Sequence, residues 1–511
     1  MLRSLIVYAI CVPLAIVVGY LLTDPLDKQS IYFVGVLVAV LIFPLLIKWH
    51  YPLLIFSYAF PATLFFLPGR PSLFLAMVAA SLTISVVERI LNRNQPFLPA
   101  SAVRWPLLAL LGIVFLTAKL TGGFGLRSFG SEVYGGKKYV YLIVGILSFF
   151  AVTARPIPKK SANLYITLYF ISGIFNALSD LYPFVPSLLR FIYLIFPPSS
   201  NSMGLDNEWQ LGVTRMLGIA MAAGAIFFWM VARHGLRDNI LTGKLWRPLV
   251  LGLMFILIFL GGFRSSIIGL VLVLGLIFYF EKMHRSGFML VVVMGGIMGA
   301  ALLVPLAPRL PYTFQRALAF LPLDISTQAR MDAEGSTQWR LDMWQALLPQ
   351  VPQYLLLGKG YAFSAETFNE SMGADAMFHN NAIDASQDPL ALASDFHSGP
   401  LSVVITFGLW GVLAWLWFWA AGGWVVWRNF RYGDPALRHI NLFLFASFIA
   451  KCFSFLFIFG GIVEDVGAFG MIFGLSIALN HGVMRPRPAP RVNPALANRG
   501  LAFPARPALQ P

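Results

Sequence analysis

Apolar runs long enough to cross a membrane recur along almost the whole chain. Of the 511 residues, 58% are hydrophobic and only 12% are charged. A helix of about 20 apolar residues spans the hydrocarbon part of a bilayer, and lipid offers no partners for the polar groups of an open backbone. The sequence therefore excludes a water-soluble core and predicts an all-α, polytopic helical membrane protein.

The apolar runs divide the chain into fourteen candidate spans. The runs 51–67 and 105–120, and the pair that meets at Phe263 and Arg264, are short enough to be re-entrant or tilted, so we expect 12–14 transmembrane helices. The first run lacks a small-x-small cleavage site, and we expect it to be retained as a span. The predicted spans are 2–22, 31–47, 51–67, 72–92, 105–120, 138–154, 161–181, 211–232, 246–262, 264–280, 287–306, 400–427, 437–459 and 465–483.

Polar stretches set the expected domain organisation. We expect a transmembrane bundle of about 11 spans over residues 1–306, and one large extramembrane segment with short helices over 307–399. The C-terminal transmembrane helices then occupy residues 400–484. Residues 485–511 are rich in Pro, Arg and Ala and cannot bury a core, so they are predicted to form a disordered tail.

Basic residues gather in alternate loops. The positive-inside rule assigns these loops, the N-terminus and the tail to the cytoplasm, and residues 307–399 to the outer face. Topology thus accounts for the formal net charge of +15, and we expect membrane lipid, and no nucleic acid, as a partner. The basic loop residues are Arg89, Arg93, Arg104, Arg155, Lys159, Lys160, Arg233, Arg237, Lys244, Arg247, Lys282, Arg285, Arg428, Arg431 and Arg438.

Arg264 is the most costly charge in the chain. It interrupts nearly forty apolar residues between Trp246 and Phe280, at the predicted outer boundary. A charge in or beside a membrane span is by default a hypothesis of function, although a long side chain can also anchor a helix end by reaching toward water. The neighbouring Gly261-Gly262 and Ser265-Ser266 favour a broken, polar opening, and Arg264 is therefore a candidate anion-binding residue.

Arg215 opens the predicted span 211–232 on the same outer side. The free amides and the positive dipole of a helix N-terminus favour anions there. Two guanidinium groups can hold a diphosphate through paired hydrogen bonds, which a lysine does less selectively. A contact with a lipid headgroup is the alternative interpretation of Arg215.

The outer segment contains a predicted amphipathic helix over Ser336–Leu348. Ser336 or Thr337 is the expected cap, and Trp339, Met343 and Leu347 follow helical spacing on one face. Such a helix is expected to lie on the membrane or on a lid surface. Arg340 either adds a third positive group or pairs with Asp342 or a headgroup.

His397 lies where the chain re-enters lipid. Ser398, Gly399 and Pro400 provide a helix start, since Pro is tolerated in the first turn. A histidine can accept a proton from a hydroxyl near neutral pH, and Asp395 could orient it. A structural role is the alternative for His397, and His379 is a rival base.

Lys451 lies near the middle of the span 437–459, close in sequence to Glu464 and Asp465. An unpaired ammonium is costly in lipid. Lys451 is therefore interpreted either as part of a structural ion pair, as a deprotonated lysine, or as a relay in an ion-coupled transporter. Transporters commonly show internal repeats around a midplane site, and no repeat is visible here.

Metal and redox chemistry have little support in the sequence. Cys11 and Cys452 lie inside apolar runs, so neither a disulfide framework nor a cysteine metal site is expected. No glycine-rich phosphate loop or His-Glu-x-x-His motif occurs. We expect no cofactor and no metal, although Asp375, Asp384, Asp388 and Asp395 leave a metal site conceivable.

Three motifs resemble the O-antigen ligase and polymerase family of bacterial membrane glycosyltransferases. The first is Gly262-Phe263-Arg264-Ser265-Ser266, and the second runs from Trp339-Arg340-Leu341-Asp342-Met343-Trp344 to Leu357-Gly358-Lys359-Gly360-Tyr361. The third runs from Phe396-His397-Ser398-Gly399-Pro400-Leu401 to Phe407-Gly408-Leu409-Trp410-Gly411. Each is short, but their order, spacing and shared outer position strengthen the resemblance, which covers roughly residues 205–420.

The resemblance implies a multi-pass enzyme of the bacterial cytoplasmic (inner) membrane with its active site facing the periplasm. It implies an undecaprenyl-diphosphate-linked glycan as donor and an acceptor glycan or lipid-linked saccharide as the second substrate, with inversion at the transferred sugar. It implies that Arg215 and Arg264 hold the diphosphate, with Arg340 as a third contact, and that His397 activates the acceptor hydroxyl. Ligase and polymerase remain alternatives, and an ion-coupled transporter is the competing function.

Overall fold

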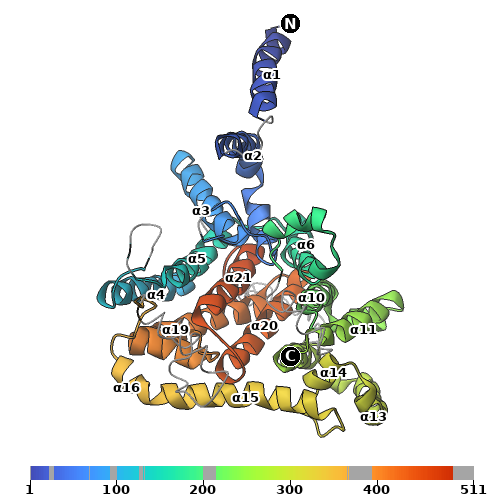
Figure 1. Ribbon diagram of the computed structural model, residues 1–511. Coiled ribbons are helices and arrows are strands. Elements are labelled where there is room, and N and C mark those ends of the chain that lie inside the picture. The colour runs from blue at the N-terminus through green and yellow to red at the C-terminus, as the bar shows by residue number, and fades with distance from the viewer. Residues whose placement is uncertain are drawn as a thin grey trace, which may run out of the picture.

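The computed structural model describes residues 2–21, 28–67, 69–92, 101–125, 131, 133–198, 215–364, 366 and 394–486. Within these segments every named element is a helix, and pairing of extended backbone is limited to two isolated bridges, Thr63 to Ser72 and Tyr134 to Phe363. The predicted all-α, polytopic fold is confirmed. Figure 1 shows a bundle around α20 and α21, with α1 projecting away from it.

The helices follow the order of the chain. The α-helices are α1 (Leu2–Leu21), α2 (Lys28–Ser57), α3 (Leu73–Leu91), α4 (Ser101–Leu120), α5 (Gly136–Thr153), α6 (Ala162–Ile171), α7 (Ala177–Asp180), α10 (Leu217–Leu241), α11 (Trp246–Ile258), α12 (Arg264–Phe280), α13 (Phe288–Leu306), α14 (Tyr312–Ala317), α15 (Thr327–Leu347), α16 (Val351–Tyr354), α19 (Gly399–Tyr432), α20 (Arg438–Phe457) and α21 (Ile462–Asn480). The 3-10 helices are η2 (Lys159–Ser161), η3 (Ser172–Asn176), η4 (Tyr182–Phe184), η5 (Ser187–Leu194), η6 (Phe259–Gly261), η7 (Met283–Arg285), η8 (Ala307–Arg309), η9 (Leu348–Gln350) and η11 (Pro435–Leu437).

Nine helical stretches in the described part of the chain are long and apolar enough to cross a membrane, and three shorter apolar helices accompany them. The predicted spans 31–47 and 51–67 are wrong as separate helices, because α2 runs unbroken to Ser57 with Pro44 and Pro52 inside it. Membrane helices tolerate Pro where neighbouring groups satisfy the freed backbone carbonyls. The run 105–120, by contrast, belongs to the full-length helix α4.

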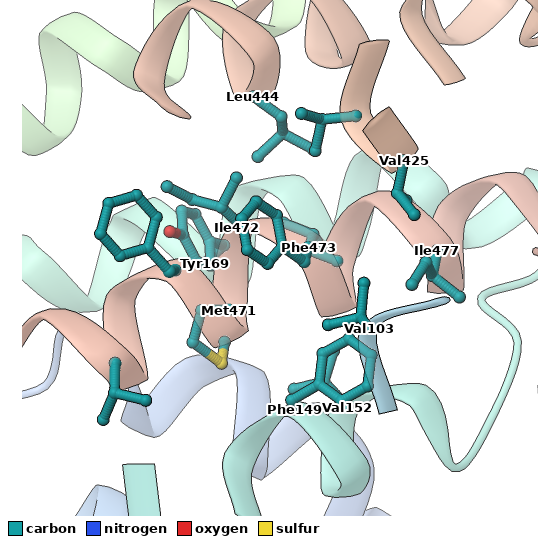
Figure 2. Packing of buried hydrophobic residues seen from close by; sticks show 14 of the residues in the cluster. Val103, Phe149, Val152, Tyr169, Val425, Leu444, Met471, Ile472, Phe473 and Ile477 are labelled. Atoms are coloured by element: carbon teal, nitrogen blue, oxygen red, sulfur yellow. The ribbon is translucent and has the colours of Figure 1, made fainter. Parts of the chain in front are cut away.

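Helix α21 is the centre of the bundle. Of its most apolar stretch, 83% is buried inside the protein. Figure 2 shows Phe473 and Ile477 of α21 among Val425 of α19, Leu444 of α20 and Phe149 of α5. Apolarity alone does not explain this position, because the stretch Phe288–Arg309 is more apolar and none of it is buried.

Small residues bring α21 and α5 into close contact. A Cβ on Gly467 would lie 3.6 Å from the Cα of Gly145, and one on Gly470 would lie 3.2 Å from Oγ of Ser148. Membrane helices associate through close packing, because lipid gives them no hydrophobic drive to do so. These glycines therefore allow the backbone approach that holds the central pair together.

Helix α15 lies along one end of the bundle, with α14 and α16 at its two ends (Figure 1). The first residue of α12 and the start of α19 both contact α15. We call this end the site end. The predicted helix Ser336–Leu348 is wrong at its start, since α15 begins at Thr327. Ser326 is the cap: its hydroxyl accepts a hydrogen bond from the Ala329 amide at 3.3 Å.

The apolar face expected on this helix exists, but it packs on protein. Met343 and Leu347 are buried against Phe396, Leu401 and Ile405, at and after the start of α19, and Trp339 is partly buried beside them. A face expected to lie on the membrane or on a lid surface therefore fastens α15 to the bundle.

Candidate active site

Arg215 and Arg264 lie on either side of one glycine turn. Helix α11 ends through η6, Gly262 adopts a left-handed conformation with φ of +65°, and α12 begins at Arg264. A Cβ on Gly262 would lie 3.8 Å from Cγ of Arg215, so the turn leaves room for that side chain. The expected break at Gly261-Gly262 thus brings together two arginines that are 49 positions apart in the sequence (264 − 215).

Arg215 binds an acid that the sequence motifs did not indicate. Its Nη2 donates to Oδ2 of Asp332 on α15 at 3.1 Å. The same oxygen accepts hydrogen bonds from Nε of Arg316 at 2.7 Å and from the hydroxyl of Tyr312 at 2.9 Å. Arg316 also donates through Nη1 to the Gly262 carbonyl at 2.9 Å. Arg316 therefore joins the glycine turn to α15.

Arg264 is held by the next turn of α15. Its Nη2 donates to the Ala333 carbonyl at 2.7 Å, to the Thr337 hydroxyl at 2.8 Å and to the Ser336 hydroxyl at 3.2 Å. All three of these contacts, which lie within the described residues, are made by Nη2. Ser336 and Thr337, expected as caps, instead orient Arg264 from inside the helix.

Arg340 is the fourth arginine at this site, after Arg215, Arg264 and Arg316. Its Nε is buried without a hydrogen-bond partner among the described residues. Burial and repulsion by the guanidiniums of Arg264 and Arg316 lower the pKa of Arg340. Asp342, its expected ion partner, instead accepts a hydrogen bond from Gln338 at 2.7 Å. The structure thus brings Arg215, Arg264 and Arg340 together with Arg316, and we call these four residues the arginine cluster.

Sequence reasoning missed Arg316 and Asp332. Both lie in a polar segment where charged residues are expected, and neither interrupts an apolar run or belongs to a recognised motif. Burial distinguishes Arg316, which is only 8% exposed. A buried guanidinium must be paired and hydrogen-bonded, and its partners Asp332 and Gly262 are distant in sequence, so no local signal could have found it.

The arginine cluster carries an excess of positive charge. Burial and the neighbouring Arg215 lower the pKa of Arg316, although Asp332 opposes this shift. Burial also disfavours the charged form of Asp332, but Arg316, Tyr312 and Arg215 outweigh it and hold the pKa of that carboxyl below its usual value. The cluster holds four guanidiniums, and its one carboxylate contacts only Arg215 and Arg316, so it favours an additional anion with several oxygens.

His397 lies just before α19, in the place the sequence predicted. Ser398 is the cap of α19, and Pro400 occupies its first turn. His397 has a φ of +49°, a left-handed conformation that is rare outside glycine and is found at functional sites. Its Nδ1 lies 3.5 Å from Oδ1 of Asp395, so Asp395 can orient the ring.

Two aromatic rings from different parts of the chain pack against the His397 side chain. Trp339 of α15 packs at a centroid distance of 5.1 Å and an angle of 83°, and Phe459, after α20, packs at 5.1 Å and 71°. Trp339 precedes Arg340, and it follows Asp332 by seven residues, roughly 10 Å along a helix. Helix α15 therefore connects the arginine cluster to His397 through one rigid element.

An apolar cavity of about 510 Å³ opens beside the arginine cluster. Leu217, which follows Arg215 by two positions, and Gly261 and Phe263, which precede Arg264, line it. Deeper lining comes from Phe228 on α10 and Leu270 on α12. The cavity lies between spans, so it can take an apolar chain whose polar end reaches the guanidiniums.

Lys451 has a partner inside the bundle. Its Nζ lies 2.5 Å from Oδ1 of Asp465, and Oδ2 of Asp465 accepts from the Gly461 amide at 3.1 Å. Lys451 also lines the cavity. The ion pair favours the structural interpretation of this lysine, because both charges are satisfied by each other and by backbone.

The rival base and most of the acids considered for a metal cannot be compared with this site. His379, Asp375, Asp384 and Asp388 lie outside the described residues, as does the tail beyond residue 486. Within the described part, no group of three or more His, Cys, Asp or Glu side chains could hold a metal ion.

The glycines of the motifs have structural roles. Gly358 and Gly360 have positive φ angles, and the amides of Lys359 and Gly360 donate to carbonyls of α19 at Ile405 and Thr406, at 2.7 and 3.0 Å. Gly408, also with positive φ, kinks α19 at this contact. The motif residues therefore divide into charged groups at the site and glycines through which residues 358–360 bind α19.

A family model described as O-antigen ligase matches residues 249–416. The matched range contains Arg264, Arg316, Asp332, Arg340 and His397, whereas Arg215 precedes it. No curated protein matches the chain. The family match agrees with the motifs at residues 262–266, 339–361 and 396–411. It confirms the resemblance to the O-antigen ligase and polymerase family over residues 249–416.

Proposed function

We propose that this protein transfers or polymerises glycan from an undecaprenyl-diphosphate donor onto an acceptor hydroxyl. One observation carries the proposal: the arginine cluster lies at an apolar cavity between membrane helices, and α15 joins that cluster to His397. A lipid-linked diphosphate requires both an anion site and an apolar channel. An attacking hydroxyl requires a base nearby.

Donor binding would use both parts of this site. Arg215, Arg264, Arg316 and Arg340 provide charged hydrogen bonds to the diphosphate oxygens. The adjacent cavity of about 510 Å³ takes the prenyl units next to the diphosphate, and the remainder of the chain stays in the bilayer. The donor glycan then extends toward α15 and His397.

Transfer would proceed by direct displacement. His397 accepts the proton of the acceptor hydroxyl, whose oxygen forms a bond to the anomeric carbon of the donor. The bond from that carbon to the diphosphate oxygen breaks, and its electron pair stays on the diphosphate. The arginine cluster stabilises this developing charge without a metal, and attack from the opposite face inverts the anomeric centre.

The topology expected from the basic loops completes the proposal. The site end faces the periplasm, the protein lies in the bacterial inner membrane, and residues 307–399 are the periplasmic segment between the bundle 1–306 and the C-terminal helices 400–484. The acceptor is a glycan or a lipid-linked saccharide. Cysteine labelling of position 397 from the periplasm of intact cells tests this orientation, and labelling only after the cytoplasm is exposed would contradict it.

Reconstitution tests the reaction itself. Purified protein is incubated with an undecaprenyl-diphosphate glycan and candidate acceptors, and the products are resolved by length. A single transferred block indicates ligation, and a ladder indicates polymerisation. His397→Ala is expected to abolish transfer, whereas His284→Ala, in η7 at the opposite end of the bundle, is expected to retain it. Full transfer by His397→Ala would exclude the proposed base.

Ion-coupled transport is the alternative, and the position of Lys451 in the cavity wall is the observation that favours it. A transporter would show ion-driven uptake in proteoliposomes that Lys451→Met removes. We expect no such uptake by the parent protein, because Asp465 already neutralises Lys451. Uptake that depends on Lys451 would replace the enzyme proposal.

A further inference from the structure

We propose that Asp332 is an internal competitor for the donor: in the empty protein its carboxylate occupies the position of a phosphate group, and the diphosphate displaces it on binding. The inference rests on the proposed function, since it assigns the arginine cluster to a diphosphate. It adds a residue that weakens binding of the diphosphate, whereas the four arginines strengthen that binding.

One oxygen of Asp332 is bound as a phosphate oxygen would be. Arg215 Nη2, Arg316 Nε and the Tyr312 hydroxyl all donate to Oδ2, at 3.1, 2.7 and 2.9 Å. Tyr312 and Arg316 belong to α14, Arg215 precedes α10, and Asp332 belongs to α15, so the convergence is a tertiary feature and not a local turn. A carboxylate and a phosphate cannot both accept from the same N–H group, so a diphosphate that binds Nη2 of Arg215 or Nε of Arg316 must displace Asp332 from it.

Asp332 does not saturate the cluster. Within the described part of the chain, Nε of Arg215 and Nε of Arg340 are buried without hydrogen-bond partners. Such groups retain a desolvation penalty until a ligand satisfies them. A diphosphate has more oxygens and more charge than one carboxylate. It can therefore displace Asp332 and also accept hydrogen bonds from the N–H groups that Asp332 does not contact.

The exchange needs no rearrangement of the fold. The Asp332 side chain is 36% exposed, and a rotamer change can turn it toward water. Arg264 remains bound to Ala333, Ser336 and Thr337, and the apolar face of α15 remains packed on α19. Only the contacts of Arg215, Arg316 and Tyr312 with the carboxylate are replaced.

The consequence for the reaction is easier product release. After transfer, the leaving lipid diphosphate carries more charge than the donor and would be held tightly by four guanidiniums. A carboxylate tethered beside it can return to Arg215 and Arg316 and compete with the product. Asp332 thus lowers affinity for donor and product alike, which sustains turnover where product release is slow.

Binding of inorganic pyrophosphate to the purified full-length protein tests this exchange. By titration calorimetry, Asp332→Asn is expected to bind pyrophosphate about tenfold or more tightly than the parent, because the internal anion is gone while the shape remains. Asp342→Asn is the matched control on the same helix, where Asp342 contacts Gln338 and not the arginine cluster. It is expected to leave the affinity unchanged.

Two further variants keep the test decisive. Tyr312→Phe removes one of the three hydrogen bonds to Oδ2, and it is expected to tighten pyrophosphate binding by a smaller factor than Asp332→Asn. Asp332→Glu keeps the charge and is expected to show no gain over the parent. If Asp332→Asn does not fold, as judged by gel filtration, the pyrophosphate affinities of Tyr312→Phe and Asp332→Glu are compared with that of the parent instead.

Equal or weaker pyrophosphate binding by Asp332→Asn would overturn the inference. It would mean that Asp332 only positions the arginine side chains. Absence of binding in every variant would overturn it as well. The proposed function is measured separately by glycan transfer. Tighter pyrophosphate binding without transfer to any acceptor would support the exchange at an anion site while removing the glycosyltransferase.

Discussion

Trp339 packs edge-on against His397, with ring centroids 5.1 Å apart and ring planes at 83°. The tryptophan belongs to the helix that binds Arg215, Arg264 and Arg316, and the histidine precedes the first turn of α19. The proposed base and the proposed diphosphate site are therefore held relative to each other by this contact and by the packing of Met343 and Leu347 on Phe396 and Leu401. In the proposed reaction, this contact sets the distance between the attacking hydroxyl and the leaving group.

Trp339→Ala should lower glycan transfer by about tenfold or more while leaving pyrophosphate binding intact. An aromatic pair of this geometry contributes about 0.5–1.5 kcal/mol beyond its buried area, and its loss frees the His397 ring. Trp339→Phe should restore much of the rate, since a smaller ring still contacts the imidazole. Trp246→Ala, at the opposite end of the bundle, is the control. Equal loss of pyrophosphate binding in Trp339→Ala would mean that α15 itself had moved.

Arg316→Ala should impair the reaction as severely as Arg264→Ala, by about 10²–10³-fold, the usual effect of removing one group that stabilises developing charge. Arg316 is buried, bonded to Asp332 and to the Gly262 carbonyl. Initial rates with the lipid donor measure the effect. Arg309→Ala, at an exposed position in η8, should retain the parent rate. A nearly normal rate for Arg316→Ala would remove this residue from the diphosphate site.

The advantage of Asp332→Asn in pyrophosphate binding should be constant from about pH 8 to pH 5. Arginine and tyrosine contacts outweigh burial and hold the pKa of Asp332 below its usual 3.8. A carboxyl with a depressed pKa keeps its contribution above its unfolded pKa and loses it as the pH falls through the lower folded value. The parent protein therefore keeps its internal anion across this range. Affinity ratios measured at each pH check this, because protonation of pyrophosphate cancels between the two proteins. A ratio that shrinks by pH 6 would contradict the assignment.

Lys451→Met should destabilise the protein more than the double variant Lys451→Met/Asp465→Asn. The single change leaves the buried Asp465 carboxylate without its ammonium, 2.5 Å away in the parent. Removing one partner of a buried pair costs about 3–5 kcal/mol, whereas replacing both is often tolerated. Thermal unfolding in detergent compares the three proteins. If the double variant were no more stable than the single one, the pair would not explain the presence of Lys451.

Several features follow from local properties of the chain and were predicted on that basis. Span length depends on bilayer thickness and helicity on backbone hydrogen bonding, so the all-α membrane fold was evident from the apolar runs. Charges that interrupt such runs are conspicuous, which is why Arg264 was a candidate before its neighbours were known. His397 was indicated by the helix start at Ser398 and Pro400, which the structure contains.

Predictions based on local signals failed where a distant contact decided the outcome. Ser336 and Thr337 have the composition of a cap, but Ser326 begins α15, and the two hydroxyls bind Arg264 from within the helix. The predicted break between 31–47 and 51–67 does not exist, because Pro44 and Pro52 are accommodated inside α2. The low helix propensity of proline favours a helix boundary at such positions but does not require one.

The sequence by itself determined that the chain crosses a membrane as helices, and it identified Arg215, Arg264, Arg340 and His397 as unusual polar residues. Only the tertiary structure decided that three of these form one cluster with Arg316, and that Asp332 lies between Arg215 and Arg316. The physical reason is the range of the forces involved. Burial in lipid acts on each segment separately, whereas an anion site exists only when charges from α12, α14, α15 and the residues before α10 meet in space.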